Sequence, residues 1–209
     1  MEVAAIEPVV SSEQVRVWAG LQGFLSLAAL IALALFFLLA TPFGTPQTRW
    51  AWLGPVNDWL AVLGAGPWVV AMILLTLYVG GGPWLWTLTI AASVGAAAIA
   101  IVTLLMITGV VGLSVQSVVA VGATLVTFVW AAVAAGAANV AGALPSWVSV
   151  VAVAMVAALI VATVIASVGY AAPAGSMLQT TLYVFGAAIA GLAWLAFPAW
   201  WLVVASTLA

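Results

Sequence analysis

Six long apolar stretches, separated by short segments rich in glycine and proline, account for nearly all of this 209-residue sequence. Each stretch has about 20 residues or more, the length that an α-helix needs to cross the hydrocarbon core of a bilayer. The sequence therefore predicts an all-α, polytopic membrane helix bundle with six transmembrane helices. The predicted spans lie at about residues 17–40, 58–79, 84–107, 117–139, 147–168 and 180–205.

The composition agrees with a membrane environment. Hydrophobic residues make up 68% of the chain and charged residues only 3%, whereas soluble domains carry about 25% charged residues. A surface this apolar needs lipid tails or other proteins around it. We expect residues 1–16 to form an N-terminal segment and residues 17–209 to form a single six-helix transmembrane domain, with membrane lipid as its first partner.

The N-terminal segment does not resemble a cleavable signal, because it carries three glutamates against one arginine and a signal begins with a basic region. Ser11 is followed three residues later by Gln14, a spacing typical of a capping box at a helix start. We therefore expect the first helix to begin at Ser12 and to continue to Ala40 as a retained membrane span.

Missing residue types exclude much chemistry. The chain has no cysteine, no histidine and no lysine, which removes thiol catalysis, the usual zinc and haem ligands and Schiff-base formation. Two arginines cannot make the basic surface that nucleic acid requires. We predict no enzyme activity, no catalytic residues, no metal site and no nucleic-acid partner.

The stretch from Arg49 to Asp58, where the first connection meets the second span, holds the candidate site. It contains Arg49, one of the two arginines, and Asp58, the only acid outside the N-terminal segment. The structural interpretation makes Asn57 or Asp58 the cap of the span at 58–79, with Asp58 facing the helix dipole and paired with Arg49. The functional alternative places Arg49, Asn57 and Asp58 at the mouth of an ion, proton or solute path, because intramembrane acids often mark such paths.

Short connections predict antiparallel neighbours, and six spans place both chain ends on one side of the membrane. The connections at 41–57, 108–116 and 169–179 then share the other side, which collects most of the polar loop residues and is the side to which we expect a site to open. Arg16 lies on one side and Arg49 on the other, so the positive-inside rule leaves the orientation open.

Proline and tryptophan suggest details of the spans. Pro67, which follows Gly64 and Gly66, should kink its helix, and Pro198 should bend the last turns of the final span. Most of the twelve tryptophans lie near predicted helix ends and fit aromatic belts at the membrane surface: Trp18, Trp50, Trp52, Trp59, Trp84, Trp86, Trp147, Trp200 and Trp201. Three fall deeper and either pack between helices or line a cavity for a pigment, quinone or lipid tail: Trp68, Trp130 and Trp194.

Small residues recur in three of the spans, where they allow helix backbones to approach closely. The partner is either another helix of the same chain or another molecule. The residues concerned are Ser93, Gly95 and Ala97, then Ala131 to Gly136, and finally Gly186, Ala190 and Gly191.

Two short pieces carry a resemblance to a known group. They run from Gly54 to Leu60 (Gly-Pro-Val-Asn-Asp-Trp-Leu) and from Ala196 to Trp200 (Ala-Phe-Pro-Ala-Trp). On these pieces and the helix layout, the chain resembles uncharacterised six-helix bacterial integral membrane proteins of the domain-of-unknown-function type. The resemblance implies the same topology and a multi-pass protein of the cell membrane, the bacterial inner membrane. Loops of such proteins are generally basic, whereas the Leu144-Pro145 turn here is uncharged.

Four of the five predicted connections carry no charge, although loops in free water normally do. We therefore expect partners to cover this protein, either copies of itself in a homo-oligomer or other subunits of a larger membrane complex. The predicted function is a structural or accessory membrane subunit without a cofactor. The alternatives are a channel or carrier for a small neutral or lipophilic solute, and binding of a lipid or carotenoid-like hydrophobic ligand.

Overall fold

The computed structural model describes residues 10–40 and 48–208, and in this part of the chain the fold is all-α. This confirms the predicted fold class. The six long helices are α1 (Ser12–Leu35), α2 (Leu53–Tyr78), α3 (Pro83–Ile107), α4 (Leu113–Val140), α5 (Ser146–Ala171) and α6 (Met177–Thr207). A π-helical segment, η1 (Phe36–Ala40), continues α1, and a single 3₁₀ turn, η3 (Thr48–Trp50), precedes α2.

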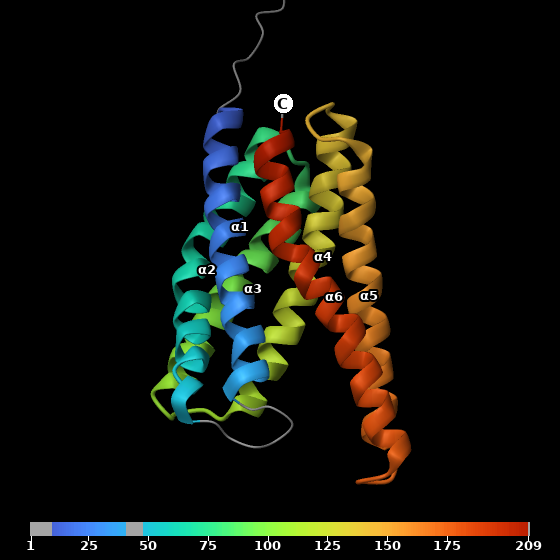
Figure 1. The fold of residues 1–209 in the computed structure, drawn as a ribbon. Helices are drawn as coiled ribbons and strands as arrows, with labels where there is room; N and C mark the ends of the chain where they lie inside the picture. Colours follow the sequence, from blue (N-terminus) through green and yellow to red (C-terminus); the bar gives the residue numbers. More distant parts are fainter. Residues whose placement is uncertain (1–9, 41–47, 209) are drawn as a thin grey trace, which may run out of the picture.

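The helices form an up-and-down ring in which each helix packs against its neighbours in the chain and α6 returns to α1 (Figure 1). The start of α1 and the end of α6 lie together at one end, with the α2–α3 and α4–α5 turns. We call this the terminal end. The opposite end, to which α1, α3 and α5 run before their connections, is called the loop end.

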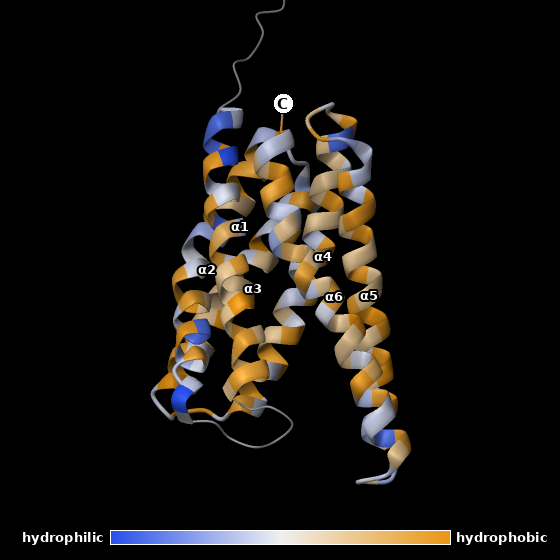
Figure 2. Ribbon diagram, viewed as in Figure 1, coloured by the Kyte–Doolittle hydropathy of each residue, from blue (hydrophilic) through white to orange (hydrophobic). Residues whose placement is uncertain are grey.

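All six helices, with η1 counted as part of the first, are long and apolar enough to cross a membrane. Hydrophobic residues colour the middle of every helix, and the hydrophilic ones gather mainly near the two ends of the bundle (Figure 2). This is the pattern of a multi-pass membrane protein, because a bilayer leaves only the ends of the spans in contact with water and headgroups.

Side-chain caps start the first and last helices. At α1 the predicted capping box is present, with Ser11 Oγ accepting from Gln14 N at 3.2 Å and Gln14 Oε1 accepting from Ser11 N at 3.1 Å. At α6 only half of this arrangement recurs: Ser176 Oγ accepts from Gln179 N at 3.2 Å, whereas Gln179 Oε1 accepts from Gly175 N at 2.8 Å. Because the cap lies there, α6 begins at Met177, three residues before the predicted span.

The predicted start of the second helix is wrong. Helix α2 begins at Leu53, five residues earlier, so Asn57 and Asp58 lie inside it and neither is its cap; the capping position belongs to Trp52, which makes no side-chain capping bond. Pro55 explains the difference. It is the third residue of the helix, within the first turn, where a missing N–H costs nothing because those amides have no intrahelical acceptor.

Helix α4 also begins earlier than predicted, at Leu113. Helix α3 ends at Ile107, and Gly109 then adopts a φ of 75°, which lets Val110 N donate to Leu105 O at 2.8 Å. This closing bond makes the turn short. Ser114 and Gln116, expected in the loop, therefore lie in the first turn of α4 at the loop end of the bundle.

At the terminal end, α1 and α6 are in close contact. A Cβ added to Gly23 would meet Leu202 Cδ2 at 2.8 Å, so only glycine allows this approach. Arg16 Nε donates to Ala205 O at 3.0 Å. A cation from α1 thus compensates the negative C-terminal end of α6, which has no basic residue in its own last turn.

At the loop end, α5 and α6 stand apart from the other four helices as a two-helix hairpin (Figure 1). Tyr170 and Met177 there are 84% and 87% exposed. The hairpin is held together by small residues: a Cβ on Gly186 of α6 would lie 3.2 Å from Ala162 O of α5. The small residues of α6 therefore serve, at this position, packing within the chain.

Candidate functional site

The predicted site residues lie at the loop end. Asn57 and Asp58 are in the second turn of α2, and Asn57 Nδ2 donates to Asp58 Oδ1 at 3.2 Å. Arg49 lies in η3, with its guanidinium carbon 5.3 Å from the centre of the Trp50 ring. No ion pair between Arg49 and Asp58 is found within the described residues. Arg49 instead makes a cation–π contact with Trp50, and Asp58 accepts from the Asn57 amide.

This arrangement limits the chemistry at Asp58. Its carboxylate is half-buried beside a neutral amide. Hydrolysis would need a nucleophile activated by a base, or two acids acting together. Within the ranges that the structure describes, no group of three His, Cys, Asp or Glu residues comes together. The carboxylate can attract a cation at the membrane surface, and its side-chain partner among the described residues is the neutral Asn57 amide.

No polar path continues from Asp58 along its own helix. From Trp59 to Leu75 every residue of α2 is apolar apart from the indole nitrogens of Trp59 and Trp68. The next hydroxyl is Thr76, near the opposite end of the helix. A solute entering at Asp58 would therefore meet only hydrocarbon and aromatic surface on α2.

The interior toward the terminal end is filled by an aromatic cluster from three helices. Its rings belong to α2, α4 and α6 and contact one another at centroid distances between 4.9 and 6.3 Å. Trp130 stacks on Trp201 at 5.7 Å with an interplanar angle of 24°. The members of this aromatic cluster are Trp68, Phe128, Trp130, Phe197, Trp200 and Trp201, all buried.

The placement of Trp200 and Trp201 in a surface belt was therefore wrong. Both are buried in the bundle interior. Phe197, Trp200, Trp201 and Val204 follow the spacing i, i+3, i+4, i+7, which describes one face of a helix. This apolar face in the sequence could have predicted that the two tryptophans are buried. The belt prediction fits Trp84, which is 81% exposed, and Trp194 lies between the two cases, half-buried beside Phe128.

A hydroxyl network fixes the cluster to neighbouring helices. Trp130 Nε1 donates to Thr89 Oγ1 at 2.9 Å, and Thr89 Oγ1 lies 2.7 Å from both Thr76 Oγ1 and Leu85 O. Since the Thr89 hydroxyl has one proton and gives it to Leu85 O, it accepts from Thr76 and Trp130. Each proton has a partner, so the network joins α2, α3 and α4 and leaves no free donor for a passing solute.

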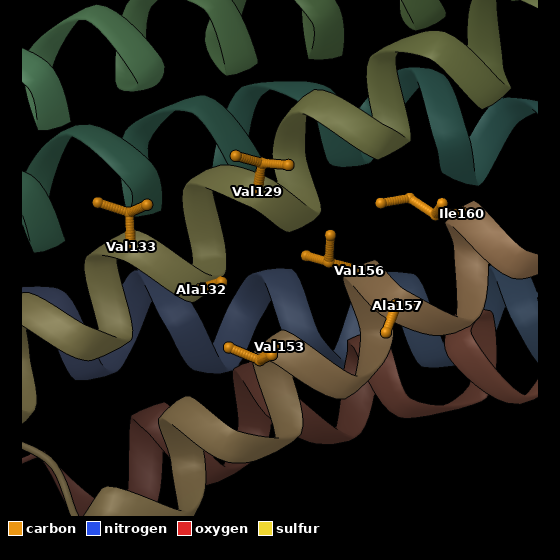
Figure 3. Close-up of a pocket in the computed structure, with 7 residues that line it drawn as sticks. All are labelled: Val129, Ala132, Val133, Val153, Val156, Ala157 and Ile160. Atoms are coloured by element: carbon orange, nitrogen blue, oxygen red, sulfur yellow. The ribbon is translucent and has the colours of Figure 1, made fainter.

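The outer surface carries a shallow apolar groove of ≈ 260 Å³ between α4 and α5 (Figure 3). Every lining side chain is aliphatic, so the groove has no polar group to orient a ligand. It suits a hydrocarbon chain or an apolar side chain from a partner. The lining residues are Val129, Ala132, Val133, Val153, Val156, Ala157 and Ile160.

The fold and the site thus define a multi-pass helical membrane protein with an aromatic interior at its terminal end. Comparisons with protein-family models, with curated proteins and with solved structures found no match. The resemblance to uncharacterised six-helix bacterial membrane proteins stays a prediction.

Proposed function

We propose that this protein is a non-enzymatic structural or accessory subunit of a membrane assembly, associating laterally with copies of itself or with other membrane proteins. The observation that carries the proposal is the α5–α6 hairpin, which projects from the ring at the loop end (Figure 1). Tyr170, Met177 and Phe185 of this pair are exposed, so its surface at the loop end is available to partners.

The exposure of the first half of α6 supports lateral association with a partner. In its last turns Phe197, Trp201 and Val204 are buried in the ring, whereas Tyr183 and Ala187, roughly three to four turns before Phe197, are exposed. Helices associate in lipid through van der Waals contact and close backbone approach at small residues. A Cβ on Gly191 would meet nothing within 4 Å, so this part of α6 offers a small-residue surface that its own chain does not cover.

The location follows from the spans and the resemblance together. Six apolar helices support a multi-pass membrane protein. We place it in a cell membrane, the bacterial inner membrane, on the sequence resemblance. The proposal requires no cofactor; a lipid or carotenoid-like chain in the groove of Figure 3 is the ligand that the apolar lining would accept.

A channel or carrier for a small neutral or lipophilic solute is the second candidate. The observation that favours it is the half-buried Asp58, with Asn57 beside it, at the end where the helices diverge. The aromatic cluster and the apolar run of α2 argue against a continuous path.

The test is the mass of the protein extracted from its membrane in a mild detergent or a lipid nanodisc. We expect an oligomer or a complex with co-purifying subunits, and Ala187→Trp on the open face of α6 should dissociate it. Ala91→Trp is the matched control, because Ala91 is an exposed alanine on α3, outside the hairpin. A monomer at native concentration, or equal effects of the two variants, would overturn the proposal.

A further inference from the structure

One face of α4 changes from buried to exposed along the helix. Thr124 and Phe128, on the part of this face near the aromatic cluster, are buried. The same spacing of three and four residues, continued toward the loop end, gives three residues that are exposed: Ser114, Ser117 and Val121. Residues at this spacing share one side of a helix, so the side of α4 that carries Phe128 is uncovered in the first turns of the helix.

Helix α6 has a matching face. Phe197 is buried, and the same spacing toward the loop end leads to Ala190, Gly186 and Tyr183. Ala190 is half-buried, Gly186 is covered by Ala162 O of α5, and Tyr183 is 40% exposed. This face of α6 therefore also loses its cover toward the loop end, except where α5 lies against it.

The two faces meet at the aromatic cluster. The Phe128 and Phe197 rings lie 5.4 Å apart, and α4 and α6 both run from the loop end to the terminal end (Figure 1). Since the rise per residue is the same in both helices, residues equally far before these two phenylalanines lie at matching positions. Two heptads before them are Ser114 and Tyr183. The uncovered faces of α4 and α6 thus continue a contact that already exists.

Pro198 lies where α6 passes from the hairpin into the ring. A proline has no N–H for the carbonyl four residues before it, here that of Trp194, which makes the helix easier to bend at this point. The side-chain hydrogen bonds described for the loop half of the hairpin stay within it, such as the bond from Gln179 Nε2 to Gly169 O at 3.3 Å. The groove between α4 and α5 has an aliphatic lining (Figure 3), which supplies no directional bond against movement of the hairpin.

We propose that the α5–α6 hairpin is a hinged element that bends at Pro198 and closes onto the first turns of α4, placing Tyr183 against Ser114. In lipid an uncovered apolar face costs little, because tails cover it as well as leucine does, so the diverging and the closed forms interconvert. Closure extends the Phe128–Phe197 contact toward the loop end. It goes beyond the assembly role, because it needs no partner, and it covers Tyr183, which that role leaves to partners.

The test is cross-linking of the full-length protein, which has no cysteine of its own, in lipid nanodiscs. A bismaleimide should join Ser114→Cys and Tyr183→Cys within one chain, because the axes of packed helices lie about 8–10 Å apart. Ser114→Cys with Val184→Cys is the matched control, since Val184 is exposed and lies one residue, or about 100° of helix rotation, away from Tyr183. We expect the first pair to link on the order of tenfold faster than the control, because only that pair is brought together by closure.

Two further variants test the register and the hinge. Val121→Cys with Ala190→Cys, one heptad before the phenylalanine pair, keeps Tyr183 and should also link within the chain. Adding Pro198→Ala should slow both reactions about threefold, because Trp194 O regains a hydrogen bond and the helix stiffens. Equal rates for the test and control pairs, links formed only between copies, or a rate that Pro198→Ala leaves unchanged would each overturn the proposal. The mass measurement for the assembly role is separate, since a monomer can still form the link within its own chain.

Discussion

The two ends of the bundle differ in how their helices are packed. At the terminal end, aromatic rings from α2, α4 and α6 fill the interior, and hydroxyl and indole groups connect those helices. At the loop end, α6 packs on α5 at Gly169 and Gly186, and the hairpin stands apart from the other four helices (Figure 1). Aromatic side chains fill the interior at one end, and the α5–α6 hairpin diverges from the other helices at the opposite end.

The difference shows what holds helices together in lipid. Lipid tails are as apolar as leucine, so burying hydrocarbon gives little stabilisation there, and helix association depends on close fit and hydrogen bonds. The aromatic cluster supplies both at the terminal end. The hairpin supplies close fit between α5 and α6, through Gly169 and Gly186.

Trp130→Ala should have the largest effect on stability. Trp130 is fully buried, stacks on Trp201 and donates to Thr89, so alanine leaves a cavity and an unmatched hydroxyl. We expect a loss of about 3 kcal/mol in unfolding free energy, measured by denaturant titration in mixed micelles. Trp84→Ala, at an exposed position, is the control; equal losses would mean that the terminal end is no better packed than the surface.

Gly186→Leu tests the loop end and should rank next. The new side chain would push α6 away from Ala162 O, at a cost of about 1–3 kcal/mol, and should separate the hairpin helices. Cross-linking between cysteines introduced into α5 and α6 would report the separation. Gly191→Leu, with open space around the glycine, should leave the cross-linking unchanged. Unchanged cross-linking in Gly186→Leu would contradict the claim that Gly186 allows α5 and α6 to pack closely.

Thr89→Val should cost about 1–2 kcal/mol. The substitution removes the acceptor of Trp130 Nε1 and the partner of Thr76, and buried donors left unpaired are destabilising, although hydrogen bonds between membrane helices are weaker than their burial suggests. Thr87→Val is the control, since the exposed Thr87 hydroxyl bonds only to Pro83 O of its own helix. Similar Tm values for the two variants would show that the hydroxyl network does not stabilise the terminal end.

Asp58→Asn should change stability least, by less than about 0.5 kcal/mol. Asp58 lies in the second turn of α2, beyond the first turn where the helix dipole acts strongly, and its neighbour Asn57 can pair with an amide as well. The same variant reconstituted in liposomes tests the transport candidate. Flux in the parent protein that disappears in a stable Asp58→Asn variant would favour a carrier over an assembly role.

Much of the fold could be predicted because its signals are local. Apolar stretches define the six spans, the Ser11–Gln14 pair defines the start of α1, and short connections define the order of neighbours. The starts of α2 and α4 were missed where polar or proline residues lie in a first turn. There Pro55 and the residues at 114–117 are compatible with both loop and helix, and only the backbone hydrogen bonds distinguish the two.

The candidate site was predicted less well. Asp58, Asn57 and Arg49 were found from their rarity in an apolar chain, and their partners were not, because which groups meet depends on how α2 and η3 are placed. Trp200 and Trp201 look like belt residues when judged by their distance from a helix end. Their burial follows from which face of α6 turns toward α4, and that direction is set by contacts with residues far away in the chain.

The amino-acid sequence by itself determined the class of this protein: six helices in lipid, joined by short turns, without the residues that most catalytic sites need. Hydrophobicity, glycine and proline act over a few residues, so they can be read one stretch at a time. Only the tertiary structure decided that aromatic residues fill the interior at one end and that the α5–α6 hairpin diverges from the other helices at the opposite end. These features depend on the rotation and tilt of whole helices, which are selected by many weak contacts acting together.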